Sequence, residues 1–171
     1  MTTDWTPEQT ARPADGPKRL SVEAGKLWAG GVATALIAAL IAIVGIVVAR
    51  GIFDIAVLAP KKSGTWGDAD TGTYALAAFG IGLLATALIH LLLVSTPSPF
   101  AFFGWVVGLC TILAALAPFA TDGDLASKVS TAVINALIGI AIWSLTDSNA
   151  RRSIRRDPMP GRIPPGGPYV A

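Results

Sequence analysis

LWAGGVATALIAALIAIVGIVVA, residues 27–49, is the stretch that decides the fold, because it runs for 23 residues without a charged side chain. Lys26 precedes it and Arg50 follows it. As an α-helix rising ~1.5 Å per residue it would be about 35 Å long, enough to cross the ~30 Å hydrocarbon core of a bilayer with some tilt. The stretch therefore predicts a membrane-spanning helix.

Three later stretches have the same apolar character. They lie at residues 74–94, 100–119 and 126–145. The whole chain of 171 residues is 53% hydrophobic and only 14% charged, whereas an ordinary soluble domain is about 25% charged. We therefore expect one domain at residues 21–146, an all-α, integral membrane four-helix bundle whose main partner is the lipid bilayer.

Both ends of the chain are polar. Residues 1–20 hold charges and prolines without an apolar period, and residues 147–171 are basic and rich in Pro and Gly. This composition predicts disordered tails. The polar N-terminus also does not fit a signal peptide, so we expect the first span to remain as an anchor. Four basic residues of the second tail are expected to meet anionic lipid headgroups: Arg151, Arg152, Arg155 and Arg156.

The distribution of Lys and Arg predicts the orientation. Four spans place both termini on one side, and that side carries nine of the 13 Lys and Arg residues. Because cytoplasmic segments of membrane proteins are enriched in these residues, we expect a multi-pass plasma-membrane protein with both termini in the cytoplasm. The net charge of +2 then follows from topology, and we expect no nucleic-acid partner.

His90, the only histidine, lies inside the second predicted span. An ionisable residue within a span is a candidate functional site by default. Thr86 precedes it by four residues and Asn135 lies in the fourth span, so Thr86, His90 and Asn135 form the candidate intramembrane polar site. A structural alternative has His90 bonded to Thr86 or to a neighbouring helix. Haem ligation by His90 would need a second axial ligand from elsewhere.

Small residues recur at helical spacing in three spans. Gly31 and Ala35 are four apart in the first span, Gly82 lies in the second, and Gly104-x-x-x-Gly108 lies in the third. Small side chains let helix backbones approach closely in membranes. Gly82, Gly104 and Gly108 are therefore predicted helix-packing positions, within the monomer, in a homo-oligomer or against a membrane partner protein.

The usual motifs of catalysis and metal binding are missing from the sequence. No Asp or Glu lies in the core of a predicted span, and there is no HExxH, phosphate-binding glycine loop or Ser-His-Asp set. The segment DADTG, residues 68–72, lacks the further ligands of a calcium loop. We therefore expect no enzyme activity, no catalytic residues, no metal and no cofactor.

Six segments together resemble a known family. They are LWAGG at 27–31, RGIFDIAVLAP at 50–60, WGDADTGTYALAA at 66–78, HLLLVSTPSP at 90–99, FFGW at 102–105 and ASKVSTAVINALIGIAI at 126–142. They are similar to a family of small four-span membrane proteins seen in actinobacteria, a domain of unknown function. The resemblance covers about residues 26–146. It implies a plasma-membrane location but no catalytic or binding residues.

We interpret the chain as an uncharacterised plasma-membrane protein with a structural, accessory or interaction role and no catalysis. The alternative is a small-molecule transporter or exporter component. Its polar cavity would be lined by Thr34, Thr86, His90, Thr111 and Asn135. A weaker alternative is a redox subunit in which His90 ligates haem.

Overall fold

Four long helices make up the protein in a computed structural model, which describes residues 21–60, 66–68 and 70–155. They are α1 (Ala24–Gly51), α2 (Thr71–Ser95), α3 (Pro99–Leu116) and α4 (Leu125–Ser153). A short 3₁₀ turn, η1 (Ala117–Ala120), continues α3. All four helices, with η1 added to α3, are long and apolar enough to cross a membrane. The prediction of an all-α four-helix bundle is confirmed.

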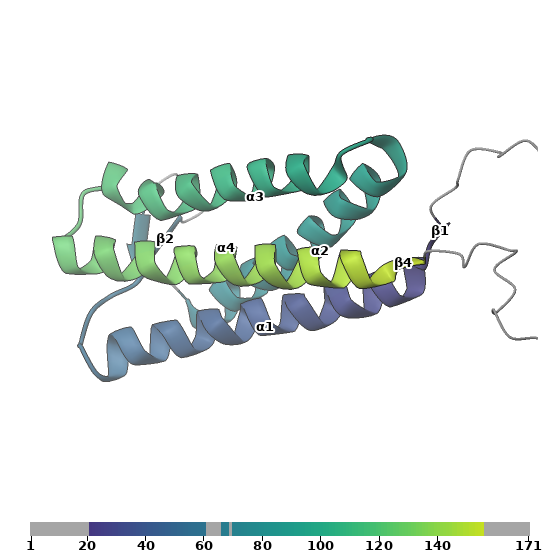
Figure 1. Cartoon of the computed structure of the whole chain (residues 1–171). Helices are drawn as coiled ribbons and strands as arrows, with labels where there is room; N and C mark the ends of the chain where they lie inside the picture. The colour runs from purple at the N-terminus through teal and green to yellow at the C-terminus, as the bar shows by residue number, and fades with distance from the viewer. Residues whose placement is uncertain (1–20, 61–65, 69, 156–171) are drawn as a thin grey trace, which may run out of the picture.

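The bundle has two ends, which we call the terminal end and the hairpin end (Figure 1). At the terminal end α1 begins, α4 ends and α2 turns into α3. Two short strands pair there in antiparallel fashion, β1 (Ser21–Val22) and β4 (Ile154–Arg155). The Glu23 N–H also donates a hydrogen bond to the Ser153 carbonyl, 3.0 Å away. The first and last described residues therefore lie side by side.

The hairpin end carries the connection between α1 and α2. It includes an antiparallel pair of strands, β2 (Leu58–Pro60) and β3 (Trp66–Asp68). The pair is tied to the bundle, because the Leu58 N–H donates to the Thr131 hydroxyl of α4 over 2.9 Å, and Val57 beside it is fully buried. The long loop between the first two spans is therefore held against α4 at this point.

Two aspartates begin the helices that leave the hairpin end. Asp70 caps α2 by accepting from the Thr73 backbone N–H at 2.8 Å, and Asp124 caps α4 by accepting from the Ser127 N–H at 3.0 Å. Hydrogen bonds from the backbone and side chain of Thr73 lower the pKa of Asp70, and those from Ser127 lower the pKa of Asp124. Both carboxylates thus satisfy backbone donors that a helix start leaves open.

The fourth helix continues past its predicted span. Residues 147–153 were expected to begin the second tail, but they form the last turns of α4. A bidentate pair between Arg151 and Asp147, with Nε at 2.7 Å from the carboxylate, supports these turns. The point where apolar residues become rare therefore marks the predicted edge of the membrane, and α4 itself continues beyond it. The predicted disorder of residues 1–20 and 156–171 lies outside the described residues.

Two glycines allow a close contact between α1 and α2. A Cβ atom added to Gly82 would stand 2.7 Å from the Ala35 Cα, and one added to Gly31 would stand 2.4 Å from the Thr86 Cγ2. Real Cβ atoms do not approach so closely. The two backbones therefore come together only because both positions lack a side chain.

Candidate functional site

Asn135 joins three helices near the hairpin end of the bundle. Its Oδ1 accepts a hydrogen bond from the Tyr74 hydroxyl of α2, and its Nδ2 donates to the Ala114 carbonyl of α3 over 2.8 Å. The side-chain amide of Asn135 thus accepts one hydrogen bond and donates another. Asn135 therefore works as a hydrogen-bonded tie between helices, and Tyr74 is a partner that the sequence pattern does not reveal.

Thr86 is fully buried between α1 and α2. Its hydroxyl donates to the Gly82 carbonyl of its own helix over 3.0 Å. Its side chain lies against the Gly31 position of α1. The Thr86 hydroxyl is therefore hydrogen-bonded within its own helix. Among the described residues, no hydrogen bond joins Thr86 to His90.

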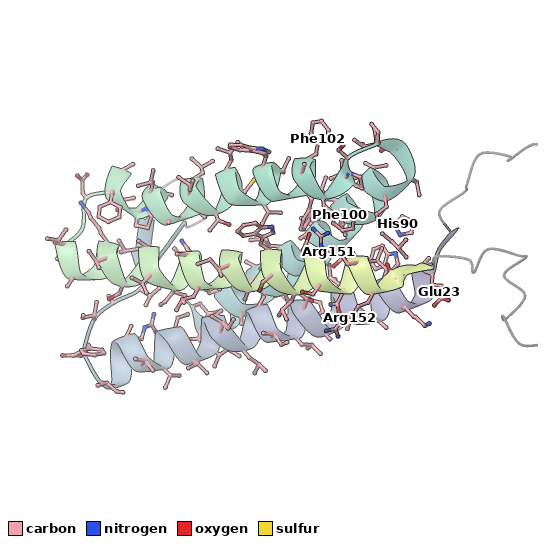
Figure 2. All side chains as sticks on the ribbon, viewed as in Figure 1. Glu23, His90, Phe100, Phe102, Arg151 and Arg152 are labelled. Atoms are coloured by element: carbon pink, nitrogen blue, oxygen red, sulfur yellow. The ribbon has the colours of Figure 1, made fainter. Side chains whose placement is uncertain are left out.

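His90 lies at the terminal end of the bundle (Figure 2). Its ring packs against that of Trp28 in α1, with centroids 6.4 Å apart and planes tilted by 48°. The Nδ1 atom is buried and has no hydrogen-bond partner within the described part of the chain. Across the same residues, no group of three His, Cys, Asp or Glu side chains could hold a metal ion. The observed environment is a ring contact between helices.

The structure does not bring the predicted polar site together. Tyr74, which bonds Asn135, and His90 lie on the same helix sixteen residues apart, about 24 Å at ~1.5 Å per residue. Asn135 and His90 therefore lie toward opposite ends of the bundle. The structure thus separates Asn135 from His90, whereas Thr86 stands one helical turn from His90 on α2, and a shared function of the three residues stays a prediction.

The remaining threonines of the predicted transport cavity also turn back onto their own helices. Thr34 donates to the Gly30 carbonyl over 2.9 Å, and Thr111 donates to the Val107 carbonyl over 2.7 Å. Asn149 adds a link that sequence reasoning missed, because its Nδ2 reaches the Gly30 carbonyl across helices at 3.1 Å. The Thr34 hydroxyl also accepts from the Asn149 Nδ2 at 3.3 Å, so it is bonded both within its helix and between helices. Asn149 lies beyond the predicted fourth span, in a segment whose composition predicts a tail.

Gly108 of α3 faces open space, and Gly104 has room for ordinary van der Waals contact only. A Cβ atom on Gly108 would meet no atom within 4 Å, and one on Gly104 would first meet the Trp143 ring at 3.6 Å. Both line a groove of about 420 Å³ between α3 and α4, which we call the α3 groove. Its lining includes Gly104, Trp105, Gly108, Leu109, Ile112 and Trp143. The glycine pair therefore makes no close helix contact within the monomer, and its packing role remains a prediction for contacts between molecules.

The third helix is the least buried of the four. Only 6% of its most apolar window is buried inside the bundle, against 28–33% for the other spans. Its buried residues are Phe103 and Val107. Most of the surface of α3, including the α3 groove, is therefore left for contact with other molecules in the membrane.

A second hollow, the terminal hollow, lies where α2 turns into α3. It measures about 400 Å³, and its lining includes Leu93, Thr96, Ser98, Phe100, Ala101 and Ile154. The Arg151 guanidinium lies over the Phe100 ring, 4.1 Å from its centroid (Figure 2). A cation from α4 thus stands beside a largely apolar depression.

Replacing Asn135 with Leu tests the tie between α2, α3 and α4. We expect a loss of about 0.6–2 kcal/mol in the free energy of unfolding, the range of interhelical hydrogen bonds in membranes. Equilibrium unfolding in mixed lipid–detergent micelles measures the loss. Tyr74→Phe removes one of the two bonds and should cost less. Equal stability of Asn135→Leu and the wild type would show that the tie contributes nothing.

These features define the protein as a multi-pass membrane protein. Residues 22–152 match the model described as "Family of unknown function (DUF6069)", and the chain belongs to this family. Neither the curated proteins nor the solved structures gave a match. The resemblance seen in the sequence is confirmed as membership of a family of unknown function. Its occurrence in actinobacteria stays a prediction.

Proposed function

We propose that this protein is a non-catalytic accessory protein of the plasma membrane, which acts by packing α3 against a helix of a second membrane protein or of another copy. The observation that carries the proposal is the exposure of α3. Only two residues of α3 are buried, and the α3 groove stands open on its surface. A helix can approach closely where small residues leave its backbone accessible, and Gly104 and Gly108 provide such a place.

The interior of the bundle supports this role over transport. The buried core is mainly alanine and branched apolar side chains. Thr34, Thr86 and Thr111 bond to their own helix backbones, and neither the α3 groove nor the terminal hollow includes them in its lining. Transport through the centre of the bundle would need polar side chains that line a passage. The hydroxyls of these three threonines are hydrogen-bonded to helix backbone instead.

The haem alternative needs a second axial ligand for His90 from elsewhere, and it stays the weaker alternative. The His90 ring packs on Trp28. The proposed orientation, with the terminal end in the cytoplasm, rests on the excess of Lys and Arg beside the termini.

Gly108→Leu tests the proposal. The substitution fills the α3 groove without a clash in the monomer, since no atom lies within 4 Å of the new Cβ. We expect co-purification of a partner protein, or the homo-oligomer, to fall by about tenfold or more, which corresponds to ~1.4 kcal/mol. Native mass spectrometry after gentle extraction measures the change.

Gly80→Leu is the matched control. Gly80 lies on α2 and also has open space around its Cβ position, so it adds the same side chain away from the groove. Association should survive this change. Undiminished association in Gly108→Leu, or a retained small molecule in place of a protein partner, would contradict the proposal.

A further inference from the structure

We propose that the terminal hollow binds one anionic phospholipid, with the lipid phosphate at Arg151. This site adjoins the α3 groove, because Phe100 and Ala101 line both, but its phosphate contact at Arg151 does not depend on the proposed function. It is also more specific than the expected attraction of a basic tail to headgroups, because it selects one arginine and one position. Three observations carry it: the hollow itself, the placement of the Arg151 guanidinium, and the apolar surface that continues from the hollow.

The guanidinium of Arg151 is held in place with donors to spare. Asp147 accepts from its Nε at 2.7 Å and from its Nη2 at 3.1 Å, and Phe100 supports one face. An arginine has five N–H donors in a fixed planar arrangement, so these two bonds leave others unused. The side chain is 59% exposed. A phosphate can therefore reach it, and arginine suits phosphate recognition by its planar geometry.

The surroundings favour a lipid over a soluble anion. Leu93, Phe100 and Ile154 give the hollow apolar walls beside this cation. Phe100 and Ala101 also line the α3 groove, so apolar surface continues from the hollow along α3 and an acyl chain can follow it. A free phosphate would gain nothing from these walls. An anionic headgroup with attached chains matches both the charge and the apolar surface.

Arg151→Gln and Arg152→Gln make a matched pair. Both remove one positive charge from the same turn of α4, but Arg152 points away from Phe100 and Arg151 (Figure 2). We expect native mass spectrometry of the full-length protein with equal amounts of palmitoyl-oleoyl phosphatidylglycerol and phosphatidylethanolamine to show one retained phosphatidylglycerol. Arg151→Gln should lower this retention roughly tenfold, the effect of losing charge-assisted hydrogen bonds, and Arg152→Gln should leave most of it.

Ala101→Leu tests the hollow without changing any charge. Ala101 is exposed and lines the hollow where it meets the α3 groove, so a larger side chain there obstructs the lipid and not the bundle. We expect it to reduce phosphatidylglycerol retention as well. Equal losses in Arg151→Gln and Arg152→Gln would overturn the proposal in favour of diffuse attraction. Displacement of the lipid by millimolar inorganic phosphate would overturn it in favour of a free-anion site.

Discussion

Gly82→Ala should destabilise the protein by about 1–3 kcal/mol, the usual cost of overpacking a tight core. The added Cβ would lie 2.7 Å from the Cα of Ala35 and 3.3 Å from its backbone nitrogen. Backbone atoms cannot rotate out of the way as the end of a side chain can. The helices α1 and α2 must therefore separate, and contacts along their whole interface are weakened. Equilibrium unfolding in lipid–detergent micelles measures the effect.

Gly80→Ala is the control for this prediction. It lies two residues away on the same helix, and its Cβ would meet no atom within 4 Å. Alanine is favoured over glycine in a helix interior by roughly 0.5–1 kcal/mol, so this variant should be neutral or slightly more stable. If both variants behaved alike, the close contact between α1 and α2 would not exist as described.

Gly139→Ala should have a comparable effect on the attachment of α3. The new Cβ would lie 2.2 Å from the Thr111 Oγ1 and 2.8 Å from its Cβ. Rotating the hydroxyl away does not help, because the Thr111 Cβ itself is too close. We expect a loss of about 1–3 kcal/mol in the free energy of unfolding, measured as above. Because α3 has few other buried residues, this variant should also loosen α3 from α4 in hydrogen-exchange measurements.

Thr111→Gly provides the rescue. It removes the side chain that the new methyl group would strike, so the double variant Thr111→Gly, Gly139→Ala should be more stable than Gly139→Ala alone. The size exchange is specific to this pair of positions. A double variant that is no more stable than Gly139→Ala would show that the loss arises elsewhere than at the α3–α4 contact.

The fold could be predicted because length and polarity decide it. A stretch such as residues 27–49 has no folded alternative in lipid except a helix, since every backbone polar group must be satisfied within the segment. The sequence determines the ends of the helices less well than their existence. The predicted end of the fourth span at Leu145 marks where apolar residues thin out, whereas α4 ends at Ser153. The helix continues because pairs such as Arg151 with Asp147 support it outside the apolar layer.

The candidate site could not be predicted to the same degree. Thr86, His90 and Asn135 are all polar residues within spans, but the sequence does not give the relative depth and rotation of the helices. Those quantities decide that Asn135 meets Tyr74 and that His90 meets Trp28. The sequence also does not show which glycines make close helix contacts. Packing at Gly82 involves a close backbone contact, whereas Gly108, equally small and in a stronger motif, faces open space.

Crosslinking from the α3 surface in native membranes tests the central claim most directly. A photoreactive residue at Leu109, which lines the α3 groove, should capture a protein, either a partner or a second copy. The same residue at Cys110, exposed on α3 but not among the groove residues, should give mainly lipid adducts. Lipid adducts alone from position 109 would contradict the account, because they would show that no helix covers the face of α3 on which the proposed function depends.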